Sequence, residues 1–322
     1  MLSLPDFKEK QLMVVRANYG ERACLRIQND NLVFEKDGRV IAKMSGHRTF
    51  AVFVIGDIVL TVPFLRKARE LAVSVFILKH NLDYCGGFSP VAEGHTVLRS
   101  AQYIATTERE LELARTIVMN KVENQLNLLK ERKIITEDDV TAELVKSANS
   151  VKIAEDSQQL LGIEGSSTRT YFGKYFETIK WRRRAPRTKE DIPNFLLDMG
   201  YTYLFNFTDA LLRLHGFDTY KGIYHKLFFQ RRSLACDLVE PMRSIIDRQL
   251  LKAYNLRQVR ENDFKVVNGQ YTLTFQSQKP YIEMFTGVIM DAKESIYQYV
   301  HGYYQHFLKP EVYEMPTFRI IS

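Results

Sequence analysis

Residues 222–243 read GIYHKLFFQRRSLACDLVEPMR and hold the side chains that most constrain the fold and chemistry of this chain. Asp237 and Glu240 are three residues apart, so one face of a helix would carry both carboxylates. Apolar neighbours predict that this helix is largely buried, and a buried carboxylate is costly unless it is paired or bound to a metal ion. Together with His225, the pair could hold a divalent ion. Ion pairing with the nearby arginines is the alternative, and composition alone favours it.

Another acidic residue, Glu164, lies upstream in the stretch LLGIEGSSTRTYF, residues 160–172. The small residues around it permit close approach of a second helix or of a phosphate backbone. An exposed glutamate on a tightly packed helix is the alternative, and spacing alone favours that interpretation. A single histidine such as His225 is, by itself, more often a hydrogen-bonded core residue than a ligand. The residues alone therefore leave both a metal site and ordinary structural contacts open.

Three motifs follow one another along the chain in the order found in a known family of proteins. Residues 162–172, 194–204 and 216–243 resemble the CRISPR-associated spacer-acquisition integrases, the "Cas-one" family, and a weaker likeness reaches back to about residue 50. In that family a glutamate, a histidine and a later acidic residue bind a divalent metal ion. The resemblance therefore implies Glu164, His225 and Glu240 as the catalytic residues and as the ligands of Mg²⁺ or Mn²⁺. Asp237 is the alternative third ligand, because the stretch after the histidine is slightly longer here than in many relatives.

The function that the resemblance implies is a metal-dependent DNA integrase and endonuclease of CRISPR adaptation. A 3′-hydroxyl of a short foreign-DNA fragment would attack a phosphodiester at the repeat boundary, and water in its place would give endonuclease activity. The implied partners are DNA (the prespacer and the CRISPR repeat), a second copy of the chain, and a small "Cas-two" subunit that bridges two dimers. The rival interpretation is a catalytically silent basic scaffold that binds branched or duplex DNA.

Charge and its distribution favour a nucleic-acid partner. The 322 residues include 45 Lys and Arg against 38 Asp and Glu, a mild excess of +7. Residues 180–189, KWRRRAPRTK, hold six positive charges and no negative one, which predicts a DNA contact, with a solvated loop as the alternative. The predicted DNA-binding residues come from this segment and from the motif FFQRRS: Lys180, Arg182, Arg183, Arg184, Arg187, Arg231 and Arg232.

The periodicity of the apolar residues predicts an α+β fold with two domains. Short β-branched runs and turn residues up to residue 90 predict a mostly β domain with one helix at 63–72, which we expect to form the dimer surface through strands 51–55 and 58–62. Residues 91–322 are predicted to be an all-α catalytic domain that carries the metal site. The helices expected there are 111–132, 136–161, 195–214, 233–254 and 280–308, with one hairpin at 264–275.

Three scattered cysteines and the lack of a long apolar run set the expected compartment. Cys24, Cys85 and Cys236 form no CxxC motif, so we expect reduced thiols and neither a disulfide framework nor a zinc site. No apolar run is long enough for a membrane span, and the first residues lack the pattern of a signal peptide. These features predict a cytoplasmic protein.

Overall fold

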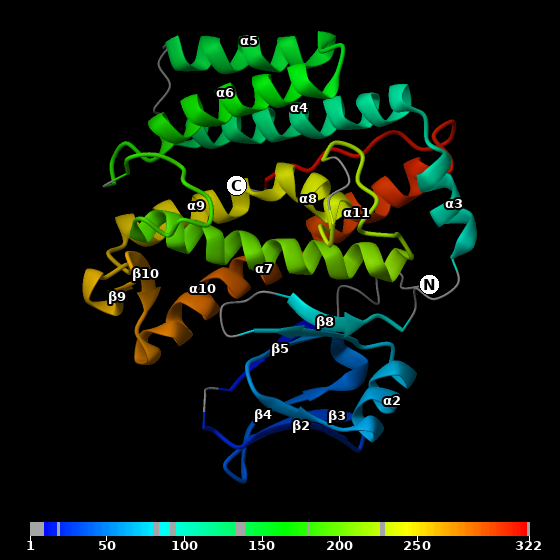
Figure 1. The fold of residues 1–322 in the computed structure, drawn as a ribbon, viewed down its shortest axis with the longest axis vertical. Helices are drawn as coiled ribbons and strands as arrows, with labels where there is room; N and C mark the ends of the chain where they lie inside the picture. Colours follow the sequence, from blue (N-terminus) through cyan, green and yellow to red (C-terminus); the bar gives the residue numbers. More distant parts are fainter. Residues whose placement is uncertain are drawn as a thin grey trace. The chain divides into compact units, whose positions relative to one another are not determined.

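The computed structural model describes residues 10–17, 20–79, 84–90, 95–132, 139–179, 181–225 and 229–320. The chain divides into two compact units. The β-rich unit comprises Met1–Ser100 with Asp209–Asp218, and the helical unit comprises Ala101–Thr208 with Thr219–Ser322. The predicted α+β class, with β structure first and helices after it, is confirmed (Figure 1).

Two four-stranded sheets make up the β-rich unit. One sheet has the order β1-β5-β7-β8, in which the first three strands are parallel and β8 is antiparallel to β7. The other has the order β4-β3-β2-β6, with an antiparallel meander of β2, β3 and β4 and a parallel β6. The strands are β1 (Gln11–Arg16), β2 (Ala23–Gln28), β3 (Asn31–Lys36), β4 (Arg39–Ser45), β5 (Thr49–Ile55), β6 (Ile58–Leu60), β7 (Ser74–Leu78) and β8 (Tyr84–Phe88).

Turn chemistry explains why the two hairpins of the meander form. Asn29 and Asp30 have φ angles of 49° and 57°, and Asp37 and Gly38 have 48° and 77°. Two successive left-handed residues make the turn whose twist matches that of paired strands, and Asn, Asp and Gly adopt it most readily. These hairpins fix the register of the second sheet.

The core of this unit lies on the apolar faces of the strands and of α2 (Val62–Glu70), which begins at the side-chain cap of Thr61. Every residue of β5 is buried, and the strand lies between β1 and β7. The expectation that strand 51–55 contributes to the dimer surface is therefore wrong, because this strand has both of its edges paired and leaves no residue exposed. β6 does lie at a sheet edge, and its Val59 is 60% exposed.

The helical unit begins with a layer in which three helices lie side by side (Figure 1). These are α4 (Thr107–Glu131), α5 (Asp139–Ile153) and α6 (Ser157–Tyr175), and they follow α3 (Thr96–Ile104). The single helix predicted for 136–161 is wrong. The first helix, α5, ends at Ile153. Asp156 then starts a new helix by accepting hydrogen bonds from the backbone N–H groups of Gln158 and Gln159, both at 2.8 Å. Glu164 lies inside α6, the helix that Asp156 starts.

The rest of the helical unit contains α7 (Ile192–His215), whose last residues group with the β-rich unit, and the helices around the acidic pair. The continuous helix predicted for 233–254 is interrupted. It consists of α8 (Ser233–Val239), the 3₁₀ turn η2 (Glu240–Met242) and α9 (Ser244–Asn255). Pro241 explains the break, because proline lacks the N–H that continues a helix. The carboxylate of Glu240 therefore projects from a turn between two helices.

A hairpin and two further helices complete the described chain. β9 (Phe264–Val267) and β10 (Gln270–Leu273) form the predicted hairpin. The single helix predicted for 280–308 is wrong, because α10 (Gln278–Asp291) and α11 (Lys293–Leu308) are separated at Ala292. The short 3₁₀ turns are η1 (Gly46–Arg48), η3 (Glu261–Asp263) and η4 (Phe275–Ser277). Within the described ranges, none of the helices has both the length and the apolar character that a membrane crossing requires.

The region in which we expected the domain boundary is described only in part. Residues 84–88 form β8, a strand that the sequence pattern did not predict. Residues 91–94, which follow this boundary, and residues 136–138, where the helix predicted for 136–161 was expected to begin, lie outside the described residues.

Candidate functional site

Two of the predicted ligands, Glu164 and Glu240, converge on one buried cation, the ammonium of Lys121. Lys121 Nζ donates to Glu164 Oε1 at 2.5 Å and to Glu240 Oε2 at 2.7 Å. The lysine comes from α4, and the carboxylates come from α6 and η2. The side chains of Lys121 and Glu240 are 7% and 3% exposed. Elements that are distant in sequence therefore bring the two carboxylates to a single point of positive charge.

The second oxygen of each carboxylate is also held. Tyr224 Oη donates to Glu164 Oε2 at 2.6 Å, and Arg243 Nη2 donates to Glu240 Oε1 at 3.0 Å. The Arg243 guanidinium also lies 5.0 Å from the centre of the Tyr201 ring. Each carboxylate is thus oriented by one partner besides Lys121.

The positive charges around Glu164 outweigh the effect of burial on the pKa of its carboxyl group. Burial by itself would raise the pKa of Glu164, but the Lys121 ammonium and the hydrogen bond from Tyr224 hold that pKa at about 2. Burial and the neighbouring Glu164 raise the pKa of Tyr224 well above its usual range. Glu164 is therefore an anion at neutral pH, and Tyr224 keeps its hydrogen and donates it.

His225 is oriented by Asp237, which is fully buried. Asp237 Oδ1 accepts from the backbone N–H of His225 at 2.9 Å and lies 2.6 Å from its Nδ1. Asp237 Oδ2 accepts from the backbone N–H groups of Ile223 and Tyr224 at 2.8 and 3.1 Å. Because a carboxylate only accepts, His225 Nδ1 carries the hydrogen, and Nε2 is left to act as a ligand.

The glycine of the Gly-x-x-His motif has a packing reason. A Cβ atom on Gly222 would lie 2.6 Å from Ser233 Cβ and 2.9 Å from Asp237 Oδ2. These distances are too short for any residue that has a Cβ atom. Only glycine therefore lets the backbone before His225 reach the Asp237 carboxylate. The motif and the acidic pair are therefore parts of one local structure.

The donor set fits a divalent metal ion in its chemistry. Two carboxylates converge on one cation, and a histidine presents Nε2 with its other nitrogen bound to a carboxylate, as metal-ligating histidines usually do. Over the parts of the chain that are described, no three histidine, cysteine or acidic side chains already stand as a complete ligand set. Lys121 lies between the two glutamates, and His225 is joined to Asp237. The four donors on Asp237 favour Glu240 over Asp237 as the third ligand.

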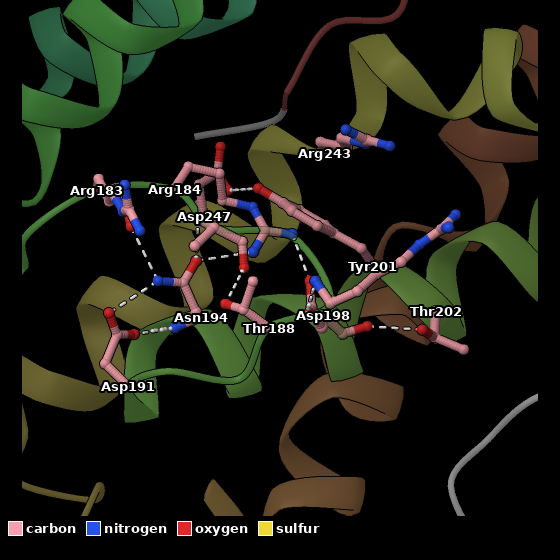
Figure 2. Close-up of polar contacts among 12 residues, drawn as sticks. Arg183, Arg184, Thr188, Asp191, Asn194, Asp198, Tyr201, Thr202, Arg243 and Asp247 are labelled. Carbon is pink, nitrogen blue, oxygen red and sulfur yellow. Dashed lines mark hydrogen bonds and ion pairs between the residues drawn. The ribbon is translucent and has the colours of Figure 1, made fainter. Parts of the chain in front are cut away.

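The basic segment is anchored to the start of α7 through Arg184 (Figure 2). Arg184 Nη1 donates to Asn194 Oδ1 at 2.9 Å, and Arg184 Nη2 pairs with Asp198 at 2.5 Å. Asn194 also accepts from the backbone N–H of Ala185 at 2.8 Å, and Asp198 accepts from that of Arg187 at 2.8 Å. Arg184 therefore shapes the segment from inside.

The other predicted DNA-binding residues differ in how they are held. Arg182 and Arg187 are exposed, and Arg183 is exposed but paired with Glu190. Arg232 lies 4.5 Å from the centre of the Phe205 ring and donates to Asn206 at 3.3 Å. Lys180 lies outside the described residues, and Arg231 stands beside the Cys236 thiol.

Trp181 packs inward and links the basic segment to the helix that carries Glu164. Its ring centre lies 5.6 Å from that of Phe172 and 5.2 Å from that of Phe176. This tryptophan, although it adjoins three arginines in the sequence, is thus part of an aromatic cluster with the C-terminal end of α6. This cluster holds the segment at Trp181, and the Arg184 contacts hold it near its middle.

Several residues around the site were not predicted from the sequence. Asn120 and Asn124, which flank Lys121 on α4, bind the backbone of Phe318, and Asn124 also donates to the carbonyl of Pro241 at 3.0 Å. These contacts fix α4 against η2 and against the segment after α11. The helix that presents Lys121 is therefore held in register with the turn that presents Glu240.

Asp247 on α9 forms a second buried network close to Arg243. Tyr171 Oη donates to one of its oxygens at 3.1 Å and Tyr201 Oη to the other, and Figure 2 shows Tyr201 and Asp247 facing each other. Burial raises the pKa of Asp247 to about 6, although the two hydroxyls and the charges of Arg243 and Arg184 lower it in part. This carboxylate therefore titrates in a range that an exposed aspartate does not reach.

Asp247→Asn should change how stability depends on pH. The pKa of Asp247 in the folded protein, about 6, is above its ordinary value of 3.8, so the folded state binds the proton more tightly than the unfolded state does. Folding stability from this group therefore increases as the pH falls. Between about pH 7.5 and about pH 4, the free energy of unfolding of the native protein should rise by about 2 kcal/mol relative to Asp247→Asn. Urea titrations at several pH values measure this, and a constant difference would contradict it.

The fold and this buried centre define an α+β protein whose helical unit carries paired carboxylates. A family model described as CRISPR associated protein Cas1 matches residues 19–286, most of the chain. The chain belongs to the Cas1 family, which confirms the resemblance found in its motifs. The CRISPR-associated endonuclease Cas1 1 of Moorella thermoacetica is 30% identical over 262 residues, which are 76% of this chain and 76% of that protein.

Solved structures share the fold over nearly the whole chain. A chain of a Cas6-RT-Cas1--Cas2 complex matches with a TM-score of 0.80 and 24% identity over 98% of this chain, which spans 36% of that chain. A casposase bound to integration product matches with a TM-score of 0.79 and 20% identity, over 97% of this chain and 96% of that one. At these identities the likeness establishes the fold alone.

Proposed function

We propose that this protein is a metal-dependent DNA endonuclease and integrase that inserts short foreign-DNA fragments into a CRISPR array. The observation that carries the proposal is the convergence of Glu164 and Glu240 on one buried positive charge, next to Tyr224 and the oriented His225. The name of the Moorella relative, an endonuclease, and the integration product bound to the structurally similar casposase support the same chemistry.

Glu164, Glu240 and His225 would hold Mg²⁺ or Mn²⁺. When bound, such an ion supplies positive charge that polarises the phosphate and stabilises the oxygen that attacks or leaves. Asp237 keeps His225 Nε2 available by holding Nδ1, and Tyr224 and Arg243 hold the outer oxygens of the two carboxylates. A histidine in the set makes manganese at least as suitable as magnesium. Joining exchanges one phosphodiester for another, so no nucleotide has to be hydrolysed.

The DNA fragment has two ends, and this determines the assembly that we propose. A fragment must be joined at both ends, one on each target strand, so two active sites at a fixed separation are needed, and a symmetric dimer supplies them. The edge strand β6 and the start of α2 expose Val59 and Val62 in the β-rich unit, which suits a dimer surface. We propose that a Cas2 subunit lies between two dimers; a chain that shares this fold belongs to a complex that contains Cas2. The cytoplasm is the proposed compartment.

A joining assay separates this function from a silent DNA scaffold. The full chain, mixed with a labelled DNA fragment, a target repeat and a Cas2 subunit, should form joined products with Mn²⁺ or Mg²⁺ and none with a chelator. A scaffold would bind the same DNA with or without the ion and form no products. Joining that is equal in the chelator would contradict the metal requirement.

The anchoring of the basic segment predicts which arginines bind phosphate. Arg182→Ala combined with Arg187→Ala should weaken DNA binding and lower the salt slope by about 0.9 per lost phosphate contact, about 1.8 in total. Lys279→Ala is the matched control, because this lysine is 82% exposed on α10, and we expect it to leave the slope unchanged. Binding titrations over a range of salt concentrations measure both slopes. An unchanged slope in the double variant would return the segment to the solvated-loop alternative.

A further inference from the structure

Lys121 is an unusual residue for the centre of a metal site. Its ammonium is buried, it contacts both carboxylates that would bind the ion, and its own charge repels a second cation at that place. Lysine is seldom buried without partners, and here the two glutamates are its partners. The lysine is therefore a cation that belongs to the carboxylate pair.

The position of Lys121 is built into the fold. Asn120 and Asn124 on the same helix are hydrogen-bonded to the backbone of Phe318, and Asn124 also binds the carbonyl of Pro241. Pro241 directly follows Glu240. The contacts that fix α4 therefore also fix the distance between Lys121 and Glu240. The contact between these two residues is set by the packing of the fold and not by the conformation of a surface side chain.

We propose that Lys121 is a positioning residue that serves as an internal counter-cation: it holds Glu164 and Glu240 together until a divalent ion displaces its ammonium. This inference rests on the proposed function, because it requires that the two carboxylates bind a metal ion. To bind, the ion must break two short charge-assisted hydrogen bonds and enter next to a positive charge. Lys121 therefore weakens metal binding while it keeps the metal-free site assembled.

The remaining contacts show why the carboxylates should survive the loss of Lys121. Tyr224 still binds the outer oxygen of Glu164, and Arg243 still binds that of Glu240. Both groups would stay near their present positions, now as two uncompensated anions. Two adjacent anions attract a divalent ion more strongly than a pair that is already neutralised in part. Removing the charge of Lys121 should consequently tighten metal binding, whereas a purely structural lysine would leave it unchanged or weaken it.

The test is calorimetric titration of the full chain with MnCl₂ alone, without DNA. Lys121→Met should bind Mn²⁺ about tenfold or more tightly than the native protein. Lys121→Gln, which keeps a hydrogen-bond donor but no charge, should change the affinity in the same direction. Lys130→Met is the matched control, because Lys130 is an exposed lysine on the same helix, and its affinity should equal that of the native protein.

Thermal unfolding gives a second readout that does not depend on activity. Without metal, Lys121→Met should unfold at a lower temperature, because two buried anions repel each other. Saturating Mn²⁺ should then raise its unfolding temperature by more than it raises that of the native protein. If the native protein binds Mn²⁺ and both Lys121 variants bind it equally or more weakly, the counter-cation role is wrong. If neither native nor variant protein binds Mn²⁺, the proposed metal site is wrong and this role with it.

Discussion

Glu164→Gln should abolish DNA joining, with a fall of about 10³-fold or more in rate, while DNA binding stays within about twofold. The amide keeps the shape of the side chain and an oxygen for Tyr224, but it removes the charge that would hold the metal ion. His225→Ala and Glu240→Gln should have effects of the same size, because all three act on one ion. DNA affinity comes mainly from phosphate contacts elsewhere, so it should be preserved. Single-turnover joining and gel-shift titrations measure the two quantities.

The matched control for these variants is Glu283→Gln, the same chemical change at a glutamate that is 65% exposed on α10. It should join DNA at the native rate. Calorimetry with Mn²⁺ should also show binding to the control and none to Glu164→Gln. Native joining by the Glu164 or the His225 variant would show that the ligand assignment is wrong.

Asp237→Asn should have a large effect for a different reason. Asp237 accepts four hydrogen bonds, three from the backbone N–H groups of residues 223–225 and one from His225 Nδ1. An amide in its place would point its NH₂ group at buried donors, which should cost about 3 kcal/mol or more of folding stability. The loop that carries His225 would lose its orientation, so joining should fall strongly as well.

Denaturant titration of Asp237→Asn measures the stability loss, with Asp291→Asn, an exposed position at the end of α10, as the control. The same variants titrated with Mn²⁺ distinguish the two roles of Asp237. If it supports His225, stability and metal affinity should fall together. Normal stability with lost metal affinity would instead identify Asp237 as a ligand. If folding stability and metal affinity are both normal, Asp237 has neither role.

Local signals in the sequence predicted the parts of the fold that local chemistry determines. Asn268-Gly269 adopts left-handed conformations and closes the hairpin predicted for 264–275. Asn29-Asp30 and Asp37-Gly38 do the same within the domain predicted to be mostly β. The helices were predicted too long where a cap or a proline interrupts an apolar pattern that otherwise continues, as at Asp156 and Pro241. Strand β5 was expected at the dimer surface because β-branched composition does not reveal which neighbours a strand will have.

The candidate ligands were accessible from motifs, but the residues that hold them were not. Lys121 is 43 residues from Glu164 and 119 from Glu240, and no local spacing connects positions so far apart. One signal could have identified it: Lys121 lies three residues after Val118 on the apolar face of α4, where a lysine must find a buried partner. Tyr224 gave no such signal, because an aromatic residue in an apolar stretch is usually part of a core.

The most direct test of the metal site is a crystal structure of the protein soaked in MnCl₂, with an anomalous difference map calculated at the manganese edge. We expect one strong peak that contacts Glu164, His225 and Glu240, with the Lys121 ammonium moved away from the two carboxylates. A map with no peak at these residues, and with Lys121 still between the two glutamates at saturating Mn²⁺, would contradict this expectation.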